Sequence, residues 1–225
     1  MCYILTKIRN IVNIYFVYHM ILKFFVLNKI FCAINRVIKG RNMYMKQKID
    51  KPIVIVGLMG AGKTSVGKMI AKKLNLPFVD SDSEIVKSAG CSVVDIFSIY
   101  GEEEFRRVED KVIHRLLSDD KVKILSTGEG AFIIDNVRKL TKERAITIWL
   151  KADLSLLVKR TSFKKTRPLL LHYDSTRILK KLIDERYPIY AKADITVETK
   201  DEPTYKTAQN VLRALDDFLR NRGKV

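Results

Sequence analysis

The sequence has few cysteines and no metal-binding pattern among them. Cys2, Cys32 and Cys91 are the only cysteines in 225 residues, too few for a disulfide framework, so they favour a reducing compartment. We therefore expect a cytoplasmic protein. No internal repeat is present either, and a chain of this length buries a core without covalent staples. One ordinary domain with an appendage is the simplest organisation.

Acidic residues are absent before Asp50, and this absence changes how the net charge of +17 is interpreted. Residues 1–44 carry seven lysines and arginines and no acid, which leaves +10 (17 − 7) for the remainder. Beyond them, basic residues alternate with acids and no aromatic stacking platform is evident, so nucleic-acid binding is not expected. The remaining surplus fits a protein that handles anionic, phosphorylated small molecules.

The N-terminal segment lacks an uninterrupted apolar run, although it is rich in Ile, Phe, Val and Tyr. Lys23 interrupts it, whereas a spanning helix needs about 20 mostly apolar residues. A secretory cleavage site is also missing. Three interpretations stay open: a membrane-surface or weakly spanning anchor, a targeting segment, or residues that are not made because translation begins at Met43 or Met45. We favour the last. The predicted division is an extension (1–44), with membrane association only if it is present, and a domain (45–225).

From Pro52 onward, short apolar runs alternate with longer mixed segments, which is typical of strands and helices in a parallel sheet. The expected strands are PIVIVG, PFVD, KVKILST, AITIWL and ADITVE. The expected helices are residues 63–75, 83–89, 102–117, 153–161, 175–190 and 204–219. The pattern predicts a three-layer α/β domain with a five-stranded parallel sheet.

The stretch GLMGAGKT, residues 57–64, matches the phosphate-binding P-loop pattern and lies between an expected strand and an expected helix. Backbone N–H groups and the positive end of the helix dipole hold phosphate oxygens in such a loop. Lys63 would reach the β and γ phosphates, and the Thr64 hydroxyl would bind Mg²⁺. An ordinary strand-to-helix turn is the disfavoured alternative. The motif predicts a nucleoside triphosphate ligand but leaves the phosphoryl acceptor open.

Two acids, Asp80 and Asp82, follow the second expected strand in FVDSD. In an extended segment alternate side chains share a face, so both carboxylates are expected to point the same way from the ligand-binding end of the sheet. One would hold Mg²⁺ through water, and the other would accept the proton of an acceptor hydroxyl. The alternative is that Asp82 caps the next helix.

Three arginines stand in contexts that are uninformative alone. Arg106 in GEEEFRRVED could bind a carboxylate or pair with acids on a solvated helix face. Arg167 lies in KRTSFKKTRPLL, which could be a lid over the triphosphate or a basic loop. Arg186, in DERYPIYAKAD, stands near the end of a helix that Pro188 is expected to interrupt or kink.

Taken together, GLMGAGKT, FVDSD, GEEEFRRVE, STGEGA, TRPLL and ERYPIY resemble shikimate kinases in order and spacing. The resemblance covers about residues 53–219. It implies a five-stranded sheet, a substrate-binding helical segment, a lid, and transfer of the ATP γ-phosphoryl group to the 3-hydroxyl of shikimate in aromatic amino acid biosynthesis. A monomer that binds ATP and shikimate is expected, with Mg²⁺ as cofactor.

The resemblance also assigns roles. Catalysis falls to Lys63, Asp82 and Arg167. The implied metal ligands are Thr64 and Asp80. Substrate contacts are assigned to Asp82, Arg106, Gly128, Glu129, Gly130 and Arg186. ATP is bound by Gly60, Ala61, Gly62, Lys63, Thr64, Ser65 and Arg167, with Arg160 near the adenine. The competing hypotheses are a gluconate kinase and a membrane-tethered nucleotide-binding protein with weak catalysis.

Glu129 departs from the pattern, because the family usually has a third glycine at this position. Residue 129 offers its backbone N–H whatever its side chain, and Gly128 and Gly130 retain backbone freedom. We expect the carboxylate of Glu129 to face away from the substrate, toward a nearby Lys or Arg. Substitution by glycine should then leave the activity nearly intact.

Overall fold

The structure is a computed structural model, and it describes residues 48–119, 121–162 and 175–222. The predicted extension (1–44) and the lid arginine Arg167 lie outside these residues, so the predictions about them stay predictions. None of the helices in the described part of the chain is both long enough and apolar enough to cross a membrane.

Five parallel strands form one sheet, as predicted, and their order in the sheet is β2-β3-β1-β4-β5. Their bounds are β1 (Ile53–Val56), β2 (Phe78–Asp80), β3 (Ile124–Ser126), β4 (Ile146–Ala152) and β5 (Ile195–Thr199). Strand β1 is buried along its whole length because helices cover both faces of the sheet, which explains its unbroken run of Ile and Val. In the register, Val54 lies between Leu125 of β3 and Thr147 of β4.

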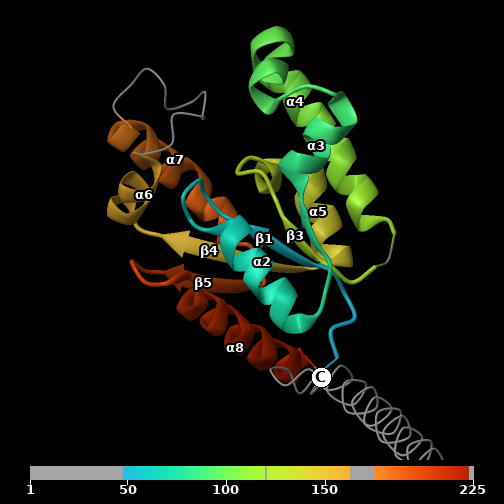
Figure 1. Cartoon of the computed structure of the whole chain (residues 1–225), viewed down its shortest axis with the longest axis vertical. Coiled ribbons are helices and arrows are strands. Elements are labelled where there is room, and N and C mark those ends of the chain that lie inside the picture. Colours follow the sequence, from blue (N-terminus) through green and yellow to red (C-terminus); the bar gives the residue numbers. More distant parts are fainter. Residues whose placement is uncertain (1–47, 120, 163–174, 223–225) are drawn as a thin grey trace, which may run out of the picture. The chain divides into compact units, whose positions relative to one another are not determined.

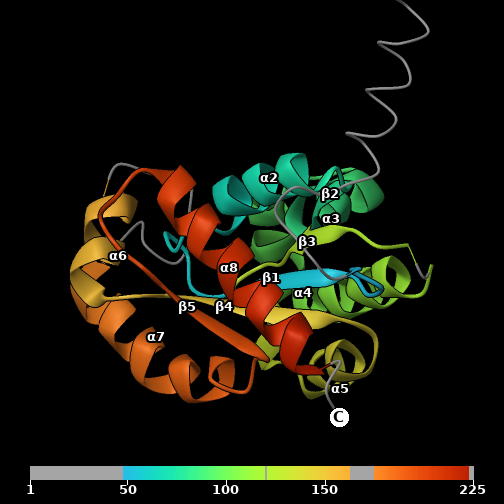
Figure 2. The ribbon, with the colours of Figure 1, turned by 90° about the horizontal axis from the view of Figure 1, so that it is seen from below.

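Helices cover the sheet on both faces (Figures 1 and 2). Helices α2 (Lys63–Leu74) and α8 (Thr204–Arg222) pack against each other and against the strands. On the other side lie α5 (Asp135–Arg144) and α7 (Ser175–Tyr190), and α6 (Leu154–Thr161) packs on α7. Helix α7 runs through Pro188 to Tyr190, so the proline does not end it. A single large apolar core fills the two interfaces of the sheet.

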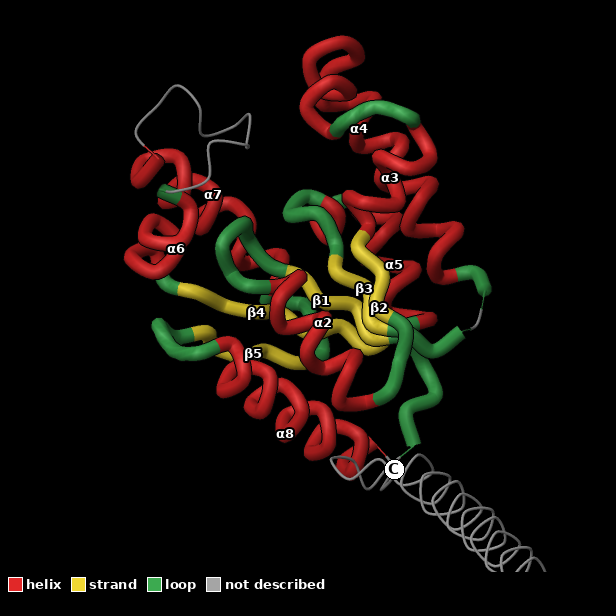
Figure 3. The backbone as a smooth tube through the Cα atoms, in the orientation of Figure 1, coloured by secondary structure: helices red, strands yellow, loops and turns green. Residues whose placement is uncertain are grey.

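Helices α3 (Ser81–Ala89) and α4 (Val93–Leu117) pack together and project from the sheet (Figure 3). They have a small core of their own, in which Ile85 meets Ile96, Phe105 and Val112. Gly101, with φ of 82° and ψ of 174°, breaks α4 in two. The second half starts at Glu102 as predicted, whereas the first half was not predicted.

The sequence also failed to predict α5 and the short 3-10 helix η1 (Ala131–Ile133) that precedes it. Helix α5 is strongly polar and buries little besides Val137 and Thr141, so its apolar periodicity is weak. The other helices and all five strands start and end within a few residues of their predicted bounds.

Candidate active site

The P-loop joins the end of β1 to the start of α2. Three glycines are required by geometry: Gly57, where a Cβ would lie 2.7 Å from the carbonyl oxygen of Leu150, and Gly60 and Gly62, which have φ of 80° and 97°. Gly62 is the N-cap of α2 and supplies no side chain to the first turn. The backbone N–H groups of that turn therefore face the space that an anion would occupy.

Lys63 is nearly buried and folds back over the loop. Its Nζ donates hydrogen bonds to the carbonyl oxygens of Gly57 (2.8 Å) and Leu58 (3.1 Å). The lysine is therefore held in place by the P-loop, the same loop that is predicted to bind the phosphates of the nucleotide. Binding a triphosphate would exchange these neutral acceptors for charged ones, which form stronger hydrogen bonds.

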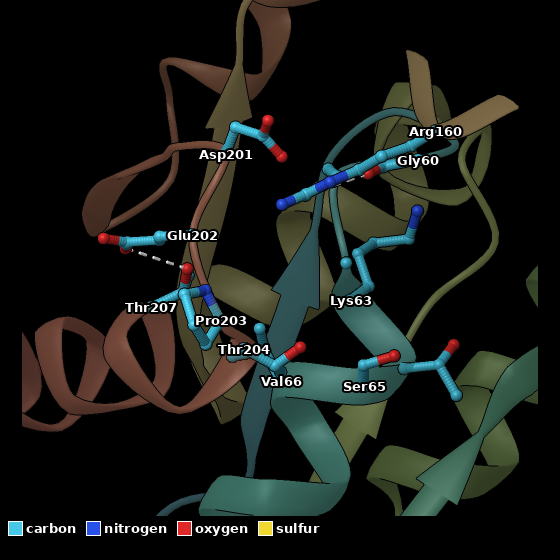
Figure 4. A pocket seen from close by; sticks show the side chains of 13 residues that line it. Gly60, Lys63, Ser65, Val66, Arg160, Asp201, Glu202, Pro203, Thr204 and Thr207 are labelled. Carbon is cyan, nitrogen blue, oxygen red and sulfur yellow. Dashed lines mark hydrogen bonds between the residues drawn. The ribbon is translucent and has the colours of Figure 1, made fainter. Parts of the chain in front are cut away.

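A pocket of about 480 Å³ opens over the P-loop (Figure 4). Residues 60–66 form one wall, and Asp201 and Glu202, from the loop between β5 and α8, lie across from Lys63. Arg160 of α6 also lines the pocket, where it donates hydrogen bonds to the carbonyl oxygens of Gly60 and Lys200. The second wall was not predicted, although its position after the carboxyl end of β5 is a signal, because ligands bind at that end of open α/β sheets.

Thr64 and Asp80, the two predicted metal ligands, lie together. The Thr64 hydroxyl donates to the Asp80 carboxylate over 3.0 Å. Asp80 is also the N-cap of α3, since its other oxygen accepts a hydrogen bond from the backbone N–H of Asp82. Within the described ranges no cluster of three or more His, Cys, Asp or Glu side chains surrounds a metal position. A cation here would therefore need phosphate oxygens and water to complete its coordination.

The prediction that Asp80 and Asp82 share one face of an extended segment is wrong. Helix α3 begins at Ser81, so Asp82 lies in a helical turn and is rotated away from the strand alternation. Asp80 meets the P-loop through Thr64, whereas an oxygen of Asp82 lies 2.8 Å from where a Cβ of Gly128 would be. Asp80 therefore lies at the P-loop, and Asp82 lies at the turn that follows β3. The residue that caps helix α3 is Asp80 rather than Asp82.

The turn after β3, Gly128 to Gly130, gathers most of the predicted acceptor-side residues. Asp82 and Glu109 approach Gly128, and the guanidinium of Arg106 lies where a Cβ of Gly130 would be. Neither glycine has a positive φ. Their predicted role is therefore corrected: they are needed because neighbouring side chains occupy the space of a Cβ, and not for backbone freedom.

Arg106 is held by acids on its own helix. Its guanidinium lies 2.7 Å from Oε2 of Glu109 and 3.0 Å from Oε1 of Glu102. Glu109 has no side-chain exposure, and its Oε1 has no hydrogen-bond partner within the described residues. Burial raises the pKa of the Glu109 carboxyl to about 7, against the opposing effect of Arg106. Sequence reasoning missed Glu109, although its i,i+3 spacing from Arg106 is a signal.

Arg186, on α7, meets the turn through Glu129. The Nη1 atom of Arg186 lies 3.7 Å from Oε1 of Glu129, and the two side chains are 12% and 13% exposed. The expectation that Glu129 points toward a basic side chain is confirmed. Because Arg186 is one of the arginines predicted to bind the substrate, the carboxylate points toward the predicted acceptor site rather than away from it.

Tyr190 fastens α7 to the same turn. Its side chain is fully buried, and its hydroxyl donates a hydrogen bond to the backbone carbonyl of Glu129. One turn earlier on the helix, Tyr187 donates to the carbonyl of Ala152 at the end of β4. Burial also raises the pKa of the Tyr190 hydroxyl, so it stays a neutral donor. The tyrosine explains why the ERYPIY motif accompanies an arginine at this site.

A family model for shikimate kinase matches residues 59–216. The chain belongs to the shikimate kinase family. A shikimate kinase from Bartonella quintana is 45% identical over 172 residues, which are 76% of this chain and 81% of that protein. The structure of a shikimate kinase from Acinetobacter baumannii in complex with shikimate has 37% identity and a TM-score of 0.71, and the match covers 73% of this chain and 92% of that one.

The predicted family, fold and enzyme class, a shikimate kinase with an ATP-binding P-loop, are confirmed by these matches. The gluconate kinase alternative is not favoured. A gluconokinase from Sinorhizobium meliloti is 18% identical with a TM-score of 0.52, over 78% of this chain and 97% of that one. That likeness shows a shared fold alone.

Proposed function

We propose that the protein transfers the γ-phosphoryl group of ATP to the 3-hydroxyl of shikimate, giving shikimate 3-phosphate and ADP. The observation that carries the proposal is the gathering of one acid and two arginines, Asp82, Arg106 and Arg186, around a single turn. That turn follows β3, which neighbours the strand that leads into the P-loop. The proposed donor and acceptor sites would thus be adjacent at the same end of the sheet.

On the donor side, residues 60–65 would hold the phosphates of ATP through their backbone N–H groups. Lys63 would move from the loop carbonyls to the β and γ phosphates, and its positive charge would stabilise the charge that develops there. Arg160 borders the same pocket and would lie beside the nucleotide. Arg167, outside the described residues, would close on ATP as the lid arginine.

The residues at the metal position fit Mg²⁺. A threonine hydroxyl and an aspartate carboxylate, Thr64 and Asp80, offer hard oxygen ligands to an ion that otherwise keeps water and phosphate oxygens. When bound, Mg²⁺ would neutralise negative charge on the transferring phosphates.

On the acceptor side, Asp82 would take the proton of the 3-hydroxyl as that oxygen bonds to the γ-phosphorus and the bond from the γ-phosphorus to ADP breaks. Arg106 and Arg186 would hold the shikimate carboxylate. The buried Nη1 of Arg186 finds no hydrogen-bond acceptor in the described part of the chain, so a ligand oxygen there would satisfy it. Positioning of this kind supplies much of the rate in phosphoryl transfer.

An ADP-release assay with shikimate tests the proposal directly. We expect turnover with shikimate and none above background with gluconate. No turnover by a folded chain that binds ATP would reject the proposal. We also propose a monomeric, cytoplasmic enzyme whose catalytic domain is 45–225. A chain that starts at Met45 should keep the full turnover number and elute as a monomer.

A further inference from the structure

Glu129 forms an ion pair with Arg186 but does not accept a hydrogen bond from its buried Nη1 atom. Their charged groups are 3.7 Å apart, which is beyond hydrogen-bond distance, and the buried Nη1 of Arg186 has no other acceptor among the described residues. The carboxylate therefore neutralises the arginine while it leaves a donor unused. An anionic ligand at Arg186 would gain the hydrogen bond but would meet the negative charge of Glu129.

The backbone of residue 129 is held against helix α7. Residue 129 does not have a positive φ, so this position accepts any side chain without strain. Its carbonyl is held by Tyr190, which stands one turn after Arg186 on α7. The side chain of Glu129 and the guanidinium of Arg186 are thus brought together by a fixed contact between the turn and the helix.

Other charges around the turn add to the effect. Arg106 already has two acidic partners, Glu102 and Glu109. The pKa of Glu109 is raised chiefly by burial, and the negative charges of Asp82 and Glu129 raise it further. The three carboxylates therefore repel one another electrostatically. A ligand carboxylate would add one more negative charge to this group.

We propose that Glu129 is a specificity-determining residue that weakens binding of carboxylate ligands by competing with them for Arg186. The inference rests on the proposed function, which assigns Arg186 to the substrate carboxylate. Repulsion by the Glu129 carboxylate weakens the binding of anionic ligands and leaves uncharged ligands unaffected. An acid therefore gains less affinity over its uncharged analogue than it would without this charge. A residue at position 129 without a charge would widen that difference.

The test compares the full-length chain with its Glu129→Gln variant, which keeps the size of the side chain and removes its charge. Two ligands are titrated by calorimetry: shikimate, and the carboxamide in which its carboxylate is replaced by an uncharged group. We expect the Kd for shikimate to fall about tenfold, while the Kd for the carboxamide changes by less than about twofold. In steady-state assays the KM for shikimate should fall and kcat should stay within about twofold, because the effect is on binding.

Two further variants sharpen the comparison. Glu129→Asp keeps the charge and withdraws it from Arg186, so its Kd for shikimate should lie between those of the wild type and the glutamine variant. Glu104→Gln removes an acid of α4 that pairs with Arg107 on an exposed face, and it should leave both Kd values unchanged.

An unchanged or higher Kd for shikimate in Glu129→Gln would overturn the inference, since a higher value would mean that Glu129 positions Arg186 for the ligand. An equal fall for shikimate and the carboxamide would also overturn it, because that result indicates a gain unrelated to charge. Failure of the proposed function is a separate result: a chain that binds ATP and shikimate but releases no ADP.

Discussion

The Oε2 atom of Glu109 lies 2.7 Å from Nη1 of Arg106, and the glutamate side chain is entirely removed from solvent. Both side chains lie against the turn that carries Glu129. The protonation of Glu109 therefore affects both the charge of the acceptor site and the free energy of unfolding. Burial opposes ionisation of Glu109 more strongly than Arg106 favours it, so the folded-state pKa of about 7 exceeds the ordinary value of 4.5.

The raised pKa of Glu109 predicts that stability falls as the pH rises. The folded state binds the proton more tightly than the unfolded state, so the full contribution is present below about pH 4.5 and is lost as the pH passes 7. A shift of this size corresponds to about 3 kcal/mol. Urea denaturation at pH 5 and pH 8 should show the loss in the wild type, whereas Glu109→Gln should lack that component. Glu104→Gln is the control and should keep it; the same pH dependence in Glu109→Gln would contradict the prediction.

Tyr190→Phe tests whether the tyrosine positions the turn. The variant leaves the carbonyl of Glu129 without its buried donor, which should cost about 1–3 kcal/mol of unfolding free energy. It should also raise the KM for shikimate, because both the turn and Arg186 depend on this contact. Tyr187→Phe is a matched control: it removes the hydrogen bond to Ala152 from the same helix, so it should lower stability without changing that KM. If the KM for shikimate in Tyr190→Phe equals that of the wild type and of Tyr187→Phe, Tyr190 contributes to stability alone.

Local patterns in the sequence predicted the sheet and the P-loop wall of the nucleotide pocket, but not the second wall at Asp201 and Glu202. A buried run of Ile and Val followed by GLMGAGKT indicates both the strand and the helix start, because strand, loop and helix start are contiguous in the sequence. Helix α5 was missed since its surface is nearly all polar. The first half of α4 was missed although its capping box, Ser92 with Asp95, is a recognisable start signal.

The acceptor half depends on contacts that no local pattern encodes. Helix α3 begins at Ser81 rather than at the predicted residue 83, and with this earlier start Asp80 and Asp82 face different partners. The pairing of Glu129 with Arg186 depends on how α7 docks on the turn. Sequence reasoning could therefore offer Asp82, Arg106 and Arg186 as candidates for this half, but it missed Glu109 and did not identify the partners of these residues.

Gly130→Ala is expected to impair substrate binding while it leaves the fold intact. The backbone at residue 130 has φ of −90° and ψ of −14°, which alanine adopts without strain. The new methyl group would overlap the guanidinium of Arg106, the far end of a flexible side chain, so the arginine would move. We expect the KM for shikimate to rise about tenfold with unchanged KM for ATP, and the Tm to fall, because moving Arg106 also disturbs its ion pair with the buried Glu109. A variant with normal KM for shikimate would show that Arg106 does not need its present position.

Asp80→Asn tests the proposed metal position separately from the helix that the same residue caps. Asparagine caps a helix about as well as aspartate, so α3 and the Tm should be preserved. The charge that would hold Mg²⁺ opposite Thr64 is lost, however. The Mg²⁺ concentration for half-maximal turnover at fixed ATP should therefore rise about tenfold or more. Thr64→Ser, which keeps the hydroxyl, is the control and should retain the wild-type dependence. If Asp80→Asn also retains it, Asp80 serves only as the cap of α3 and the metal is held elsewhere.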